Sequence, residues 1–414
     1  MKQYWLFCLS AVQDIVFCAI DNAFANNISL DVIIVINTFL IIQYFCLRPM
    51  NLGTYAYQAL QSRPKNCLVC TLLMSVLVGI ILILCAKPLT LLFDLTAKQR
   101  EALAEAIILF GFCTPIQGTC RFLMNYCNYN NKTVLAIVGS FLTYIPMLIG
   151  DWLAVVTDTG AFGLRLATEI SWLLYLVVLL PKSDILKTDD KVDFKTIRHC
   201  FYTGKEDCIS QMITRGATIF MTSMASTLGT VAYAVHAVAL GITDLGECFR
   251  EATLNYGLIE LREHRDNLYS QSLKEHRDNL YSQSLKVLKR VFIPALFLPL
   301  LLEGVLVITT HGKVEIIDTL VAAGIYSLPF LVYPLYDISA AAIRLSSVRA
   351  SLLLTSMLTA IWRVPILWVL VQCFGVSIPV LGIIYVADYG TRTLVYRIML
   401  KRDSAKVKTA DIAV

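Results

Sequence analysis

The sequence predicts an all-α membrane protein with twelve transmembrane helices, and three observations lead to this fold class. Hydrophobic residues make up 57% of the 414 residues and charged residues only 16%, against roughly 45–50% and about 25% in soluble domains. The apolar residues fall in runs of about 20, the length of helix that crosses a bilayer. Basic residues gather in alternate connections between these runs, as expected when cytoplasmic loops are basic.

Twelve spans result when the apolar runs are broken at charged residues and at clusters of Pro, Asn or Gly. Their approximate limits are 4–21, 30–50, 67–92, 103–124, 133–153, 161–181, 205–225, 230–256, 289–309, 317–341, 350–373 and 377–398. The basic connections contain Arg63 and Lys65, Arg121 and Lys132, the lysines of 181–196, the segment 263–286, Arg344 and Arg349, and the tail from Lys401. We therefore expect both termini in the cytoplasm and the protein in the plasma membrane, which is the inner membrane in a bacterium.

The first span also imitates a cleavable secretory signal. Lys2 precedes an apolar run, and small residues follow at Ala23–Ala25, as in a signal peptide with its cleavage site. Gln13 and Asp14 within the run argue for a retained helix, which keeps the count at twelve.

The chain divides into two halves with the same internal pattern. The polar linker Pro181–Thr196 separates six spans from six, which gives an amino-terminal lobe of residues 1–190 and a carboxy-terminal lobe of residues 191–414. In each half an Asn-x-Gly follows the second span, at Asn51–Gly53 and at Asn255–Gly257. Because each half has an even number of spans, the halves have the same orientation and form a parallel repeat around a central cleft. Such an architecture most often serves transport.

One twelve-residue block, EHRDNLYSQSLK, occurs twice in succession, at Glu263–Lys274 and Glu275–Lys286. Twelve residues of helix turn by about 1200°, so tandem copies do not build one continuous face. The first half closes its equivalent loop without such a block. We interpret the second copy as a recent in-frame duplication or an assembly artefact, tolerated as a cytoplasmic extension, with a functional role as the alternative.

Carboxylates inside predicted spans are candidates for an ion path, because burying a charge in a membrane is costly. Asp14 and Asp21 are seven residues apart and share one face of the first span, while the fifth and sixth spans contribute Asp151 and Thr168. Carboxylates with a hydroxyl can bind Na⁺ or take up a proton when buried. These four residues therefore form a candidate site for a coupling cation or proton, and interfacial loop acids are the alternative interpretation.

Further polar residues in the spans are candidates for a substrate cleft. The eighth span carries a stripe on one face, which consists of His236, Asp244, Glu247, Arg250 and Glu251. Such a stripe cannot face lipid, so it lines a cavity or is paired inside the bundle. Glu169, which the nearby Arg165 can pair with, and Asp337, which lies beside Pro334, join His236 and Glu247 as cleft candidates.

No catalytic or metal site is expected from the cysteines and histidines. The thirteen cysteines include one CxxC, at Cys67 and Cys70 inside an apolar run, and the five histidines form no HxxxH or HxxE pattern, so a Cys/His metal site and acid–base catalysis lack their usual residues. We expect reduced cysteines that serve packing. The net charge of +5 lies in loops and does not indicate a nucleic-acid partner.

At the polar spans the chain resembles the multidrug and toxic compound extrusion (MATE) family. STLGTVAYAVHAVALGI, residues 226–242, resembles that family's eighth helix. CAIDNAFANNISLDVIIVINTFLI, residues 18–41, is similar to its first-to-second helix passage, and IGDWLAVVTDTGAFGLRLATEIS, residues 149–171, to its fifth-to-sixth. By this likeness Asp21, Asp151 and Thr168 match the family's amino-lobe cation or proton site. Asp337 matches an acidic position in its tenth helix.

The chain also departs from the family's pattern. Met147 stands where the fifth helix usually has an asparagine, one turn before the aspartate. Thr214 and Arg215 stand near the position where one subgroup has a glutamate in the seventh helix. The usual proline of the first helix is absent, so either the amino lobe handles the coupling ion or the coupling is altered.

The resemblance implies a secondary exporter of amphipathic, often cationic solutes by H⁺ or Na⁺ antiport. It would work by alternating access, as a monomer in the bilayer, with no cofactor beyond the coupling ion. An alternative keeps the fold but moves a lipid-linked or polyanionic substrate, as related flippases do. A cleft dominated by Arg and Lys would favour that alternative, and Arg165, Arg215 and Arg250 keep it open. A membrane-embedded enzyme is the third and least favoured hypothesis.

Overall fold

The computed structural model describes residues 1–60, 62–268, 279–310, 316–346, 351–374 and 378–412, and its regular structure in this part is entirely helical. The α-helices are α1 (Lys2–Ile28), α2 (Leu30–Met50), α3 (Leu52–Leu60), α4 (Pro64–Thr90), α5 (Ala97–Tyr129), α6 (Thr133–Val156), α7 (Gly160–Lys182), α8 (Phe194–Ser226), α9 (Thr230–Leu268), α10 (Asn279–Thr310), α11 (Ile316–Tyr326), α12 (Tyr333–Leu345), α13 (Ser351–Phe374) and α14 (Ile378–Ile412). Two short 3₁₀ helices are η1 (Ile185–Lys187) and η2 (Leu328–Leu331). Within the described residues α3 continues α2, and α11 to α12 form one bent unit, so the predicted all-α class with twelve spans is confirmed.

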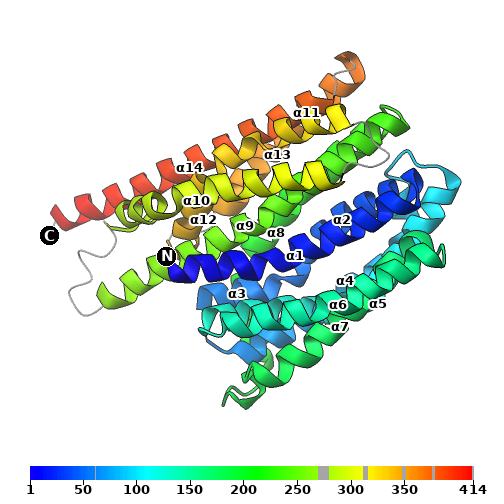
Figure 1. Ribbon diagram of the computed structural model, residues 1–414. Coiled ribbons are helices and arrows are strands. Elements are labelled where there is room, and N and C mark those ends of the chain that lie inside the picture. Colours follow the sequence, from blue (N-terminus) through cyan, green and yellow to red (C-terminus); the bar gives the residue numbers. More distant parts are fainter. Residues whose placement is uncertain (61, 269–278, 311–315, 347–350, 375–377, 413–414) are drawn as a thin grey trace.

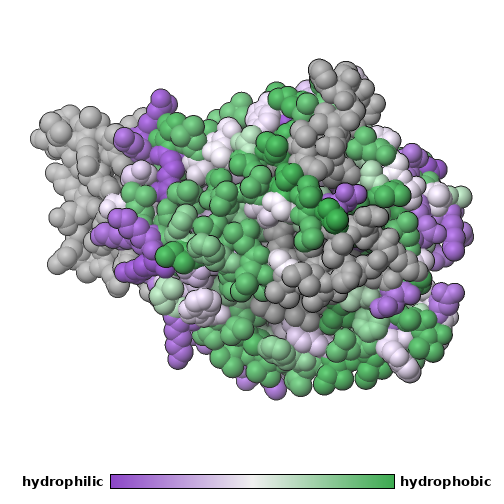
Figure 2. Space-filling model, turned by 45° about the horizontal axis from the view of Figure 1, so that its top comes forward, coloured by the Kyte–Doolittle hydropathy of each residue, from purple (hydrophilic) through white to green (hydrophobic). Residues whose placement is uncertain are grey.

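The helices have the composition and the outer surface of membrane spans. In the described part, α2, α4, α5, α6, α7 and α13 are each long and apolar enough to cross a membrane, and the pair α11–α12, bent by 42°, is a further candidate. Large apolar side chains on the outer faces are exposed, among them Leu84 (75%), Ile361 (70%) and Phe112 (68%). Figure 2 shows this apolar surface across the middle of the molecule, with hydrophilic groups toward both ends. Exposed apolar area on this scale requires a lipid surround, so the chain is an integral membrane protein.

Two groups of helices lie side by side (Figure 1). Helices α1 to α7 form the amino lobe and α8 to α14 the carboxy lobe, and α1 and α2 of the first pack against α9 and α8 of the second. Both termini lie at the same end of the bundle. The duplicated segment extends α9 and α10 at that end, and residues 269–278 within it lie outside the described residues.

The repeated Asn-x-Gly has a packing reason in both lobes. A Cβ on Gly53 would lie 2.0 Å from the carbonyl oxygen of Cys67, so only glycine lets α3 lie this close to α4. A Cβ on Gly257 would lie 2.8 Å from Cδ1 of Ile338, where α9 meets α12. The missing side chain therefore permits a close approach of α3 to α4 in one lobe and of α9 to α12 in the other.

Several helices begin at residues that satisfy free backbone N–H groups. Ser29 Oγ accepts from the Val32 N–H at the start of α2, and Thr96 and Gln99 form a reciprocal capping box at the start of α5. These are the usual devices for satisfying the first N–H groups of a helix. Gln99 also donates to Asp31 Oδ1 at 2.7 Å, which ties the start of α5 to α2.

Candidate functional site

The first candidate site is a buried acid–arginine cluster in the amino lobe, formed by Asp21, Arg165, Thr168 and Glu169. Arg165 of α7 donates to Asp21 of α1 at 2.8 Å and to Glu169, one turn further along α7, at 3.1 Å. Thr168 donates to Asp21 Oδ1 at 3.0 Å. All four side chains are almost completely buried. The cluster brings Asp21 and Thr168 together and pairs Glu169 with Arg165.

Polar and aromatic side chains extend this cluster to two more helices. Gln117 of α5 donates to both carboxylate oxygens of Glu169, at 2.8 and 2.9 Å. Gln43 of α2 donates in turn to Gln117 at 3.0 Å. The guanidinium of Arg165 stacks on the ring of Phe39, 4.4 Å from its centroid, a favourable cation–π contact. The cluster therefore ties α1, α2, α5 and α7 together.

Asp151 of α6 lies beside this cluster but is not hydrogen-bonded to it. Its side chain is fully buried, and neither carboxylate oxygen has a hydrogen-bond partner among the described residues. It is close enough to Asp21 and Arg165 to interact with their charges. Met147, also fully buried, offers no hydrogen bond. Three carboxylates thus share one guanidinium, and such an arrangement favours uptake of a proton or cation. The side chain of Asp14 lies outside the described residues.

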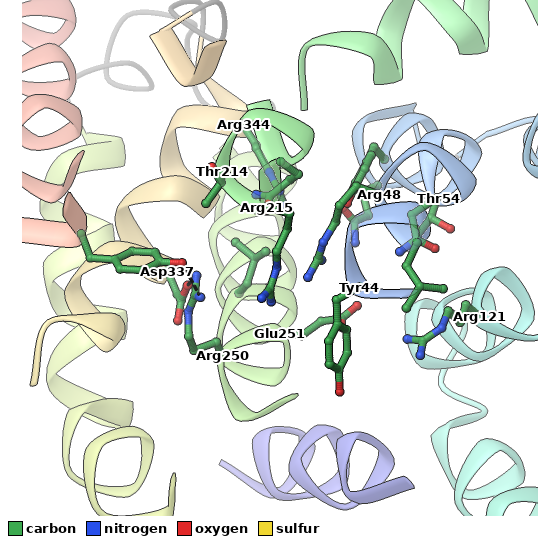
Figure 3. A pocket seen from close by; sticks show the side chains of 17 residues that line it. Tyr44, Arg48, Thr54, Arg121, Thr214, Arg215, Arg250, Glu251, Asp337 and Arg344 are labelled. Atoms are coloured by element: carbon green, nitrogen blue, oxygen red, sulfur yellow. Dashed lines mark hydrogen bonds and ion pairs between the residues drawn. The ribbon is translucent and has the colours of Figure 1, made fainter. Parts of the chain in front are cut away.

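The second candidate site is a cavity between the two lobes (Figure 3), with a volume of about 90 Å³. Its walls come from α2, α3 and α5 of the amino lobe and from α8, α9, α12 and α14 of the carboxy lobe. Since a cavity needs at least about 10–15 Å³ to hold one water, this cavity has room for several. It is large enough for a small polar group.

Positive charge dominates the cavity wall. Five arginines line it, Arg48, Arg121, Arg215, Arg250 and Arg344. Among the residues whose side chains the structure describes, two carboxylates do, Glu251 and Asp337, so this described lining has a formal surplus of three positive charges. Arginine stays protonated in proteins. Arg48 and Arg215 extend toward one another from opposite lobes and repel each other, which makes the space between them attractive to an anion.

Arg250 is fixed within this wall. It donates to Asp337 Oδ1 at 3.3 Å and to the hydroxyl of Tyr389 at 3.2 Å. Its guanidinium also lies over the rings of Tyr333, Tyr336 and Tyr389, at 4.1, 5.2 and 4.8 Å from their centroids. Three tyrosines and an aspartate are groups that would hold an organic cation. In this protein the guanidinium of Arg250 already contacts these four groups.

The other predicted cleft residues lie elsewhere or outside the described part. His236 is fully buried and hydrogen-bonds through Nδ1 to Tyr326 at 2.6 Å and through Nε2 to Thr222 at 3.3 Å. It joins α9 to α8 and α11 and is not among the residues found around the cavity. Glu169 belongs to the acid–arginine cluster. The side chain of Glu247 lies outside the described residues, whereas Asp337 lines the cavity.

Two of the cavity arginines were assigned to loops from the sequence. Arg121 and Arg344 are buried, at 7% and 8% exposed, within α5 and α12. Arg344 donates to Asp207 of α8 at 3.0 Å. Both lie near the ends of predicted spans, where arginines of cytoplasmic loops are common. The sequence therefore did not indicate that they line a cavity.

The carboxy lobe contains a buried charged network that the sequence did not indicate. Asp388 of α14 accepts from Arg363 of α13 at 2.7 Å and from Arg392, one turn along α14, at 2.6 Å. Arg392 also donates to Thr214 of α8 at 2.6 Å. All three charged side chains are at most 1% exposed. The sequence does contain one sign of this network: Asp388 and Arg392 are four residues apart in the twelfth predicted span, a spacing at which an ion pair can form on one helix.

Hydrogen bonds join the lobes on both sides of the cavity. Asn255 Oδ1 of α9 accepts from Gln58 of α3 at 3.2 Å and from Tyr129 of α5 at 3.0 Å. Near the other end of α9, the Asp94 N–H donates to Ser226 Oγ at 2.9 Å. Ser226 and Asn255 lie 29 residues apart across the α8–α9 turn, a distance that spans most of a bilayer in helical form. The two lobes are therefore held together at two levels along α9.

Comparisons with known proteins place this arrangement in a known fold. No protein family model and no curated protein sequence matches the chain. Solved structures match over nearly its whole length. An outward-facing multidrug resistance MATE family transporter of the MOP superfamily aligns with a TM-score of 0.72 and 14% identity, over 99% of this chain and 96% of that chain. An inward-facing form of a MATE family transporter aligns with a TM-score of 0.68 and 14% identity, over 95% of both chains.

A third match differs in its pocket. It is a MOP superfamily transporter from Pyrococcus furiosus, described as having a binding pocket of reverse polarity that suggests a different function, with a TM-score of 0.70 and 14% identity over 98% of this chain and 95% of that chain. At this identity the likeness establishes the fold. The predicted resemblance to MATE transporters is therefore confirmed for the architecture.

Proposed function

We propose that the protein is a membrane transporter that carries an anionic solute through the cavity between its lobes by alternating access. The observation that carries this proposal is the lining of five arginines against two carboxylates. Arginine provides several donors in a planar fork that suits phosphate and carboxylate groups. The fold supports a transporter, and hydrogen bonds that join the lobes near both ends of α9 are contacts that alternating access would break in turn.

The same charge argues against the export of cationic solutes that the resemblance implied. An organic cation entering the cavity would meet a surplus of three positive charges at low effective dielectric, where repulsion is strong. The aromatic groups that could attract it already surround Arg250. We therefore favour the alternative of a polyanionic or lipid-linked substrate.

The acid–arginine cluster is our candidate for ion coupling by H⁺ or Na⁺. Cation uptake near Asp151 would balance a buried carboxylate that has no hydrogen-bond partner among the described residues and would stabilise one packing of α1, α6 and α7. Anion binding in the cavity would stabilise another, and the coupling cannot exceed the difference in affinity between the two states. The protein would act as a monomer in the plasma membrane, with both termini in the cytoplasm.

The test compares an anion with a cation on the same purified protein. In phosphatidylcholine nanodiscs, sodium pyrophosphate should bind with an affinity that falls with salt, and ethidium should not bind. Inverted vesicles under imposed pH or Na⁺ gradients should likewise fail to accumulate ethidium. Gradient-driven ethidium transport together with no pyrophosphate binding would reject the anion hypothesis and restore the cationic exporter.

A further inference from the structure

Two cysteines, one from each lobe, meet at the end of the bundle that carries both termini. Cys67 lies in the first turn of α4 and Cys200 in the second turn of α8, and their Sγ atoms are 3.5 Å apart. Both side chains are completely buried, at 0% exposed. Because successive spans alternate in direction, α4 and α8 both begin at this end (Figure 1). The pair is therefore a direct contact between the lobes, made by residues 133 positions apart.

A short strap in the linker, residues 188–193, holds the two helix starts in place. Asp190 accepts from the Lys65 N–H at 3.0 Å and from the Asn66 amide at 2.9 Å. The amide oxygen of Asn66 accepts in turn from the Asp193 N–H at 2.9 Å. Asp193 also caps α8, so the same strap is bonded to the first turns of both helices. Hydrogen bonds outside the cysteines thus help to set the contact between the sulfur atoms.

The position of the pair suits oxidation. A disulfide has its sulfur atoms about 2.05 Å apart, so the two sulfurs, now at 3.5 Å, need to approach by roughly 1.5 Å. Asp190 of the strap is close enough to interact with both thiols. The strap continues into exposed polar residues, such as Lys191, so a small polar oxidant has a path from water that lipid does not block. Packing alone is the other role of buried thiols, but it does not require sulfur to face sulfur across two lobes.

We propose that Cys67 and Cys200 form an oxidative modification site, at which hydrogen peroxide joins the two lobes by a disulfide. The thiolate of one cysteine attacks a peroxide oxygen, the O–O bond breaks, and a sulfenic acid forms while hydroxide leaves and takes up the proton that the thiol lost. The sulfur of the second thiol then attacks the sulfenic sulfur. The S–S bond forms as the S–O bond breaks, and the hydroxyl leaves with the thiol proton as water. Two thiols are oxidised, and one peroxide is reduced to two waters.

A covalent bond at this place would arrest the movement of the lobes. Alternating access requires the lobes to separate at each end in turn, and the disulfide would hold them together at the end that carries the termini. This consequence rests on the proposed transport, whereas formation of the disulfide does not. In the proposed orientation this end faces the cytoplasm, where thiol reductants reverse accessible disulfides. The arrest would therefore last only while peroxide persists.

The experiment detects the disulfide without reference to any substrate. Full-length protein in phosphatidylcholine nanodiscs carries a protease site inserted after Asp158, in the exposed turn between α6 and α7. After hydrogen peroxide treatment and cleavage, a denaturing gel without reductant should show the two fragments joined, and dithiothreitol should separate them. Cys67→Ala and Cys200→Ala should each reduce the joined species at least tenfold. Two independent variants guard against a folding defect in one of them.

A matched control is Cys70→Ala. Cys70 lies one turn further along α4 and is 2% exposed, so this variant removes an equally buried thiol from the same helix and keeps the contact. It should give as much joined species as the wild type. In proteoliposomes, gradient-driven uptake of pyrophosphate should fall at least about fivefold after oxidation and recover with dithiothreitol, whereas uptake by Cys67→Ala should not respond to peroxide.

The outcomes separate this inference from the proposed function. No joined species in the oxidised wild type, or an undiminished joined species in Cys67→Ala and Cys200→Ala, overturns the modification site. A joined protein that transports as fast as the reduced protein overturns the arrest. If the reduced wild type transports no pyrophosphate, the proposed function fails and the arrest with it, while the gel still decides whether the two cysteines are the site of oxidation.

Discussion

Replacing Asp21 or Asp151 of the amino lobe with asparagine should have unequal effects on stability. Asp21 accepts hydrogen bonds from Arg165 at 2.8 Å and from Thr168 at 3.0 Å, in a fully buried place. Breaking a buried ion pair costs about 3–5 kcal/mol. Because Glu169 still pairs with Arg165 at 3.1 Å, we expect Asp21→Asn to cost about 3 kcal/mol, the lower end of that range.

Asp151→Asn removes a buried carboxylate that has no hydrogen-bond partner among the described residues. The mutation deletes a charge whose burial is unfavourable and keeps the shape of the side chain. We therefore expect a change within about 1 kcal/mol, or a gain. The two variants should differ in unfolding free energy by about 3 kcal/mol, although both remove one negative charge from the same lobe.

The assay is thermal unfolding of both variants and the wild type in one detergent, followed with a thiol-reactive fluorophore. Eight of the described cysteines are buried and become reactive only on unfolding. Na⁺ or acid should raise the midpoint of the wild type, since a ligand that binds only the folded state stabilises it, and Asp151→Asn should lose this response. In transport assays at matched expression, Asp21→Asn should abolish gradient-driven transport, and Asp151→Asn should weaken it. Equal destabilisation by both substitutions, or wild-type transport in Asp21→Asn, would falsify the proposed role of this cluster.

Three further predictions concern the cavity, the linker and the duplicated segment. Arg215→Gln should weaken pyrophosphate binding roughly ten- to a hundredfold in titration calorimetry, the loss expected for a hydrogen bond to a charged group; unchanged affinity would place the anion elsewhere. Lys132 and Lys187 hydrogen-bond to Asp184 and lower the pKa of its carboxyl from 3.8 to about 2, so its contribution to stability is full above pH 4 and is lost as the pH falls through 2. In Asp184→Asn, the midpoint temperature of unfolding should therefore vary less with pH over this interval than in the wild type. An unchanged pH dependence of the midpoint contradicts the prediction. Deleting Glu275–Lys286 should leave insertion and transport unchanged, because the first half manages without such a block; loss of activity at normal expression would give the repeat a partner-binding or gating role.

The spans could be predicted because length and apolar composition alone identify a membrane helix. Their ends could not, since several helices continue into polar sequence. α8 begins at Phe194, eleven residues before the predicted span at 205, because Asp193 caps it and accepts from the Thr196 N–H at 2.9 Å. The tenth span was predicted as one run beside Pro334, and the structure bends it by 42° around η2. The prolines indicated the kink but not its angle.

The amino-lobe site was partly visible in the sequence. Asp21 and Thr168 were assigned to one site and are hydrogen-bonded at 3.0 Å. The sequence indicates Arg165 as a partner for Glu169, since a spacing of four residues on one helix is readable from sequence. Its bond to Asp21 joins residues 144 positions apart, and no local pattern contains that information.

The charge of the cavity is a property of the assembled fold. Its five arginines come from α2, α5, α8, α9 and α12, so they lie in five separate spans of the sequence. An isolated arginine near the end of a span fits a loop, a buried ion pair or a cavity wall equally well. Only packing five such helices around one space turns separate residues into a surplus of positive charge. The family resemblance rested on segments of both halves and implied a cationic solute. Our proposed coupling site, rich in carboxylates, and our proposed substrate cavity, rich in arginines, differ in polarity, so a likeness at the first does not determine the second.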